Sequence, residues 1–85
     1  MNYTLAVFQS RYATLNFANI LRENNIPAAV VNTPREAGAT CGISVKFLSD
    51  YLSKVQILLS RYSNKNFAGF YTYIKRNGRM IIVKI

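Results

Sequence analysis

Apolar and polar residues follow two different spacings along this chain, one typical of strands and one typical of helices. Residues 42–48 alternate, which predicts a strand with one buried face and one wet face. Residues 11–24 instead place apolar side chains at the 3.6-residue spacing of a helix, which Ser10 is suited to cap. In the alternating strand, the side chains expected to be buried are Ile43, Val45 and Phe47, and those expected to be wet are Ser44 and Lys46.

The same spacings, with the turn residues between them, predict five strands and two helices. Pro27 prevents the first helix from continuing, and the Asn77-Gly78 pair favours a tight type I′ hairpin before the last strand. Strands are expected at residues 4–9, 28–32, 42–48, 67–75 and 80–85, helices at 11–24 and, capped by Ser49, at 50–62, and a loop at 33–40. This order predicts a single α+β domain over residues 1–85, with a ferredoxin-like β-α-β-β-α-β plan and an additional C-terminal hairpin strand.

Length and composition narrow the class further. The chain has 85 residues, and 51% of them are hydrophobic, which favours one small folded domain. The longest uncharged stretch, residues 24–34, is too short for the ~20 apolar residues of a membrane-spanning helix. The first charge is Arg11, so the start lacks the basic segment of a signal peptide, and a lone cysteine suits a reducing compartment. We therefore expect a cytoplasmic protein that does not associate with membranes.

Several kinds of catalytic site are excluded by residue types that the chain lacks. It has no histidine, so it has no Ser-His or Cys-His pair and no histidine metal ligand. Its three acidic residues are scattered, which argues against a two-carboxylate hydrolase. We expect no metal, no cofactor and no enzymatic activity. The remaining chemistry belongs to one thiol, many cations and many aromatic side chains.

Cys41 is the candidate reactive residue, because it stands between the loop at residues 33–40 and the start of a strand. A thiol reacts as its thiolate, which Arg35 of the same loop is placed to support. Gly38 and Gly42 permit backbone conformations in which N–H groups converge on an anion. The alternative is that Cys41 is a small apolar side chain buried under the loop, as free cysteines usually are.

The residues around Cys41 resemble the central signature of a known family. The segment TPR at residues 33–35 is followed, five residues later, by CGISVKF at residues 41–47. This pattern, with Ile26-Pro27 before the second strand, is similar to that of small domains described as putative selenium/sulfur carrier protein-like. The resemblance covers residues 3–73. It implies that Cys41 accepts the transferred atom and that Pro34, Arg35 and Gly42 shape its loop.

A carrier of this kind is not an enzyme. The resemblance implies that Cys41 holds sulfur or selenium as a persulfide or selenosulfide and passes it to a partner protein. The expected partner is a cysteine desulfurase or another sulfur- or selenium-transfer protein. One thiol is enough for this exchange, whereas a disulfide reductase would need a second, resolving cysteine.

Charge suggests a second class of partner. Residues 43–85 carry eight cations and one anion, which is most of the net charge of +8. Such an excess attracts acidic proteins or nucleic acid, although a solvated surface that keeps the domain soluble is the plainer interpretation. The candidate residues of this basic patch are Arg61, Lys65, Lys75, Arg76 and Arg79.

Aromatic residues in the fourth predicted strand lead to the same alternative. Phe67, Tyr71 and Tyr73 alternate just before Lys75 and Arg76, as in RNA-recognition sheets that stack bases. Strand preference alone also explains tyrosine and phenylalanine there. Two hypotheses without thiol chemistry therefore stay open, a basic nucleic-acid-binding module and an adaptor that presents its hairpin to an acidic enzyme. A homodimer that covers the second face of the sheet would supplement so small a core.

Overall fold

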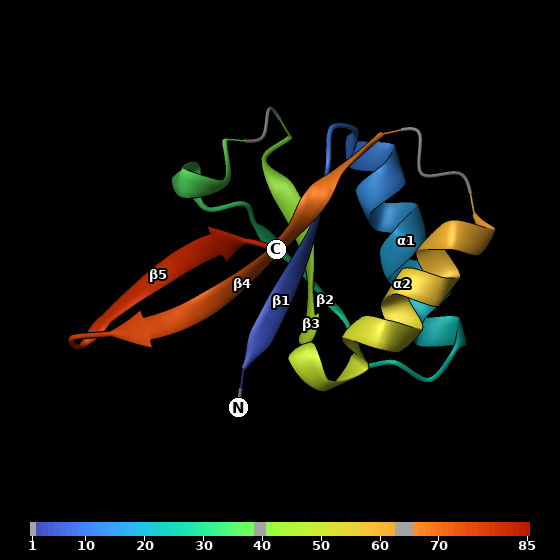
Figure 1. The fold of residues 1–85 in the computed structure, drawn as a ribbon. Helices are drawn as coiled ribbons and strands as arrows, with labels where there is room; N and C mark the ends of the chain where they lie inside the picture. The colour runs from blue at the N-terminus through green and yellow to red at the C-terminus, as the bar shows by residue number, and fades with distance from the viewer. Residues whose placement is uncertain (1, 39–40, 63–65) are drawn as a thin grey trace.

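The computed structural model describes residues 2–38, 41–62 and 66–85, and within them the chain forms five strands, two α-helices and two short 3-10 helices (Figure 1). In chain order these are β1 (Tyr3–Phe8), α1 (Arg11–Glu23), β2 (Ala29–Asn32), η1 (Arg35–Ala37), β3 (Ile43–Leu48), η2 (Ser49–Tyr51), α2 (Leu52–Arg61), β4 (Phe67–Arg76) and β5 (Arg79–Lys84). The predicted strands and helices are all present, and their ends agree to within one or two residues. The predicted loop at residues 33–40 instead contains η1, and its residues 39–40 lie outside the described part.

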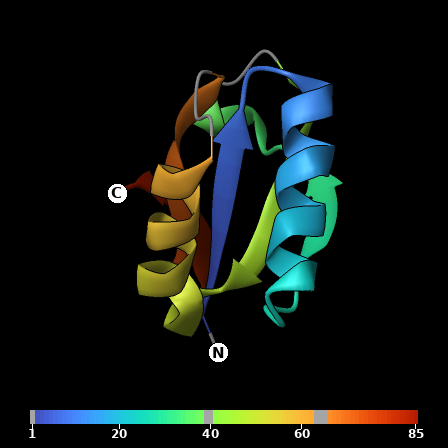
Figure 2. The same cartoon turned by 90° about the vertical axis from the view of Figure 1, so that its right-hand side faces the viewer.

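The strands form one antiparallel sheet in the order β2-β3-β1-β4-β5. Strand β3 therefore lies between β1 and β2, which α1 connects. Both α-helices cover the same face of this sheet (Figure 2). We call the opposite side, which carries Tyr3, Lys46, Tyr71 and Tyr73, the outer face. The α+β class is confirmed.

The two α-helices begin in different ways. Ser10 caps α1 as predicted, because its hydroxyl oxygen accepts a hydrogen bond from the Ala13 amide at 3.2 Å. The prediction that Ser49 caps the second helix is wrong. Its hydroxyl bonds instead to the Thr4 hydroxyl at 2.7 Å, and a 3-10 turn precedes the start of α2 at Leu52.

The hydrophobic core lies between the helices and the sheet. Four aromatic contacts run through it, including Phe8 on Phe17 and an edge-to-face pair of Phe47 and Phe70. Burial of these side chains is the main force that holds the helices on the sheet. The buried members are Ala6, Phe8, Val45, Phe47 and Phe70 from the sheet and Phe17, Ala18, Ile20, Leu21, Ile26, Val55, Leu58 and Leu59 from the helices and their flanks.

A β-bulge changes the direction of side chains in β4. Val7 faces Gly69 and Phe8 faces Phe67, so Ala68 is an extra residue in the ladder. Phe67 therefore points toward the helices, where it contacts Phe70 with ring centroids 4.8 Å apart. The prediction that Phe67, Tyr71 and Tyr73 share one face is wrong, because strict alternation does not anticipate the bulge.

The outer face is only partly wet. Ser44 and the β1 residues Leu5 and Val7 are fully buried, although their neighbours in sequence point toward the helices. The segment around η1 and the β5 strand contact each other over this face. The buried Ser44 hydroxyl has a hydrogen-bond partner, because it bonds to the Thr33 hydroxyl at 2.5 Å. The wet position predicted for Ser44 is therefore wrong, whereas Lys46 is half-exposed.

Candidate functional site around Cys41

Cys41 lies two residues before β3, at the end of the sheet where β1 leads into α1. Its position is fixed by the strand that follows it. The Thr33 amide donates a hydrogen bond to the Gly42 carbonyl at 2.9 Å, which closes the base of the segment from Thr33 to Gly42. The thiol is therefore held between the entry to β3 and the first turns of α1.

The Cys41 thiol is buried, with 9% of the residue exposed, and a polar side chain of the described part of the chain contacts it. Its sulfur lies 3.9 Å from the hydroxyl oxygen of Thr14, which is fully buried on α1. That hydroxyl donates its hydrogen to the Ser10 carbonyl at 3.0 Å. Because a hydroxyl has one hydrogen but two acceptor sites, the protonated thiol donates to Thr14 in a weak hydrogen bond.

Thr14 can also serve a charged sulfur. The Ser10 carbonyl accepts the Thr14 amide as well, at 3.1 Å, in the first hydrogen bond of α1. The hydroxyl can therefore turn its hydrogen toward the sulfur while Ser10 keeps a partner. Sequence reasoning missed Thr14. The signal was a single hydroxyl within the apolar stripe of α1, four residues after the N-cap.

The predicted loop residues differ in backbone conformation and exposure. Pro34 has an extended backbone directly before η1, and Gly38 ends η1 in the left-handed region at φ +64°, donating to the Arg35 carbonyl at 3.1 Å. Gly42 is not among the residues with positive φ. Arg35 is exposed on η1, and among the hydrogen bonds of the described residues none joins it to Cys41.

The η1 helix is tied to the outer face of the sheet. The Tyr71 hydroxyl donates to the Ala37 carbonyl at 3.0 Å, and Ala37 is buried. The contact joins residues 34 positions apart in sequence. The chain just before Cys41 is therefore anchored to β4 by a tyrosine for which the sequence left strand preference and base stacking as alternatives.

Comparison with protein families identifies a family for this chain. The model of the family described as Putative Se/S carrier protein-like matches residues 2–72. The chain belongs to this family. The match spans Cys41 and Thr14 and ends within β4, so β5 lies beyond it. Searches of curated proteins and of solved structures gave no match.

In this family member, the predicted basic patch is divided between two parts of the fold. Lys75, Arg76 and Arg79 lie together on the β4–β5 hairpin, where Arg76 faces Arg79 across the turn. Arg61 is the last residue of α2, in the helical layer, well away from the hairpin tip (Figure 1). Lys65 lies outside the described residues.

The described residues hold no group of three histidine, cysteine, aspartate or glutamate side chains that would suit a metal ion. Within the same ranges, no helix is long and apolar enough to cross a membrane.

Proposed function

We propose that this protein is a carrier that holds sulfur or selenium on Cys41 and transfers it to a partner protein. The observation that carries the proposal is the contact between the sulfur of the chain's single cysteine and the Thr14 hydroxyl, inside the segment matched by the carrier family. The ferredoxin-like core that we infer is a single domain, with β5 as an addition beside β4.

The transfer needs no external oxidant or reductant. The Cys41 thiolate attacks the outer sulfur of a donor persulfide, the donor's S–S bond breaks, and the donor leaves as a thiolate. The proton lost by Cys41 is taken up by that leaving thiolate or by water. Delivery repeats the exchange, with an acceptor thiolate attacking the outer sulfur on Cys41. A donor selenosulfide gives Cys41–S–SeH through the same exchange. The protein is therefore a substrate for transfer enzymes rather than an enzyme.

Thr14 has a defined place in this scheme. As a donor it would stabilise negative charge on the Cys41 sulfur, and as an acceptor it holds the resting thiol. Thr14 is a positioning residue because it acts through the sulfur of Cys41. Its hydroxyl can exchange these two roles by a rotation, without displacement of the backbone.

Burial of the sulfur both protects the cargo and limits its loading. Thiol exchange depends on access, so a buried persulfide would lose its outer sulfur to other thiols slowly. A donor must reach the same atom. The described contacts that hold the segment before Cys41 include the Thr33–Ser44 hydroxyl pair and the hydrogen bonds from Tyr71 to Ala37 and from Thr33 to Gly42. Loading would therefore require these contacts to loosen, as local opening permits.

The test is to incubate the reduced protein with a cysteine desulfurase and cysteine, and in a separate arm with a low-molecular-weight selenosulfide. Intact mass should show a gain of one sulfur or one selenium atom, which a thiol reductant removes. Cys41→Ser should gain nothing. Absence of the adduct, or the same adduct in Cys41→Ser, would contradict the proposal.

The role of Thr14 is tested separately by Thr14→Val, which keeps the shape but removes the hydroxyl. We expect slower loading at fixed pH and a changed pH profile of thiol reactivity. Thr14→Ser restores a hydroxyl and should recover both. If Thr14→Val loads at the wild-type rate over the whole pH range, Thr14 has only a packing role.

A further inference from the structure

The outer face carries a hollow that the carrier hypothesis does not use. It has a volume of about 420 Å³ and lies between β1, β3 and the β4–β5 hairpin. Figure 1 shows this hairpin extending away from the helices. The lining residues are Asn2, Tyr3, Lys46, Tyr73, Lys75 and Met80.

Charge and aromatic surface coincide in this hollow. Lys46 and Lys75 supply two ammonium groups, and no acidic residue is among the described residues that line it. Tyr3 and Tyr73 supply two half-exposed rings. The Lys46 ammonium lies 4.3 Å from the centre of the Tyr3 ring, so a cation and an aromatic surface stand next to each other.

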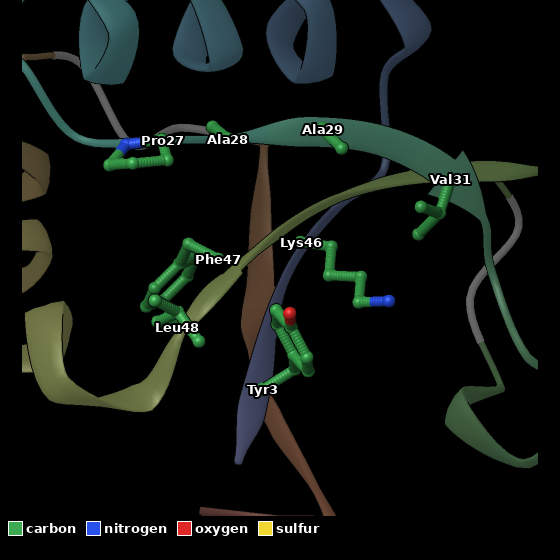
Figure 3. Close-up of a pocket in the computed structure, with 8 residues that line it drawn as sticks. All are labelled: Tyr3, Pro27, Ala28, Ala29, Val31, Lys46, Phe47 and Leu48. Atoms are coloured by element: carbon green, nitrogen blue, oxygen red, sulfur yellow. The ribbon is translucent and has the colours of Figure 1, made fainter. Parts of the chain in front are cut away.

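The hollow continues beyond Tyr3 and Lys46. A second hollow of about 340 Å³ shares these two residues and extends along β2 past Ala29 and Val31 (Figure 3). On the hairpin, the exposed Arg76 and Arg79 pair with each other one position beyond Lys75 and Met80, so strand alternation points them away from the hollow. Along the outer face, apolar surface from β2 therefore adjoins the Tyr3 ring and the Lys46 ammonium.

We propose that the outer face binds single-stranded nucleic acid, with bases against Tyr3 and Tyr73 and phosphates on Lys46 and Lys75. Single strands are bound by aromatic platforms beside cations, since every base has a stacking surface and every nucleotide carries a phosphate. Two adjoining hollows suit successive nucleotides better than one isolated nucleotide. The net charge of +8 favours a polyanion.

An acidic protein would use the lysines but would have no particular need of the exposed tyrosine rings. A duplex would use the cations and keep its bases stacked away from the rings. The coincidence of rings and ammonium groups in the hollow therefore favours an unpaired strand. This site is separate from Cys41 and does not depend on its chemistry.

The test uses the full chain and short, fluorescently labelled oligothymidine and oligouridine strands, with binding followed by anisotropy at several salt concentrations. We expect binding that weakens steeply with salt. For a single strand, the slope of log K against log salt is about −0.7 for each phosphate that the protein neutralises. The double variant Lys46→Gln/Lys75→Gln should therefore have a shallower slope. The change should be about 0.7 for each phosphate that is no longer neutralised by a lysine.

The matched control is Lys54→Gln with Arg61→Gln on α2, which removes the same net charge from the helical layer. Tyr73→Leu should weaken binding by roughly tenfold with little change in salt slope, as loss of stacking predicts. Tyr62→Leu, which alters an exposed ring next to α2, is its control. Cys41→Ser should bind as the wild type does, and circular dichroism checks the fold of each variant.

Three results would overturn the proposal. The first is no binding at low salt. The second is equal weakening by the two double variants, or an unchanged affinity in Tyr73→Leu. Either result would mean that the strand binds through the overall charge of the protein and not through the hollow. The third is displacement of the labelled strand by polyglutamate as effectively as by unlabelled strand, which would assign the face to an acidic protein instead.

Discussion

The two faces of the sheet differ in what covers them. The face under α1 and α2 is dry, and its side chains, such as Phe47 and Val45, are almost completely buried. The outer face is covered by η1 at one end, where Leu5 and Val7 are buried, and carries accessible hollows at the other. Polar groups accompany its buried part, as in the Ser44–Thr33 and Tyr71–Ala37 hydrogen bonds.

This difference assigns stability to the face under the helices and leaves the outer face available for function. A continuous apolar core provides most of the free energy of folding for a chain of this size. Hydrogen-bonded contacts contribute less each, since they replace bonds to water. We therefore expect the outer face to open or bind without loss of the fold. Cys41 lies at the end of the sheet beside the first turn of α1, where its sulfur contacts Thr14.

The largest effect that we expect is from Phe47→Ala in the core under the helices. Phe47 is 1% exposed and packs edge-to-face on Phe70, so truncation leaves a cavity that its neighbours cannot fill. The free energy of unfolding should fall by about 4 kcal/mol. Urea unfolding followed by circular dichroism measures it. Tyr73→Ala on the outer face is the comparison and should cost less than half as much. Equal losses would mean that the two faces contribute alike.

A smaller loss is expected from Gly69→Ala at the β4 bulge. Gly69 has φ +144°, which side chains rarely adopt, and an added Cβ would lie 2.8 Å from the Lys84 Cε atom. The lysine end can move, so the backbone strain dominates. It should lower the free energy of unfolding by about 3 kcal/mol.

Gly78→Ala in the hairpin turn is the matched variant for Gly69→Ala. Its φ is also positive, at +78°, but an added Cβ meets no atom within 4 Å. We expect a loss of about 1 kcal/mol, because this region is less forbidden to side chains. Equal effects of the two substitutions would show that the bulge geometry adds nothing to the cost.

The sequence predicts the fold well wherever local spacing decides it. The Ser10 cap and the strand and helix order follow from residues close together in the chain. The errors fall where distant residues decide. Ala68 becomes a bulge because β4 must pair with β1, and Ser49 turns from its helix to Thr4, 45 residues earlier. Neither contact is visible in a local pattern.

Of the candidate site, the sequence indicated Cys41 but not its partner, because a local pattern does not show contacts between distant residues. Cys41 stands out as the only cysteine beside a family-like motif, and the family match covers that segment. Thr14 does not stand out, because it is brought to the sulfur from 27 positions away. Arg35 is close to Cys41 in sequence, yet η1 leaves it exposed. Position along the chain therefore did not identify the hydrogen-bond partner of the sulfur.

The smallest effect that we expect tests whether the outer face controls access to Cys41. Tyr71→Phe removes only the hydroxyl that donates to Ala37, so η1 loses one anchor while the ring stays in place. One such hydrogen bond contributes about 1 kcal/mol. If the segment must loosen before the thiol can react, the rate with an aromatic disulfide reagent should rise by about fivefold. The free energy of unfolding should change little beyond that single bond.

Tyr73→Phe provides the control for this substitution, since Tyr73 lies two residues further along the same face and its hydroxyl makes none of the hydrogen bonds found among the described residues. Its thiol should react at the wild-type rate. An unchanged rate in Tyr71→Phe would mean that the sulfur is reached without release of η1. A similar rise in both variants would mean that loss of either hydroxyl loosens the whole outer face. Only a rise confined to Tyr71→Phe identifies the Ala37 contact as the anchor that limits entry to Cys41.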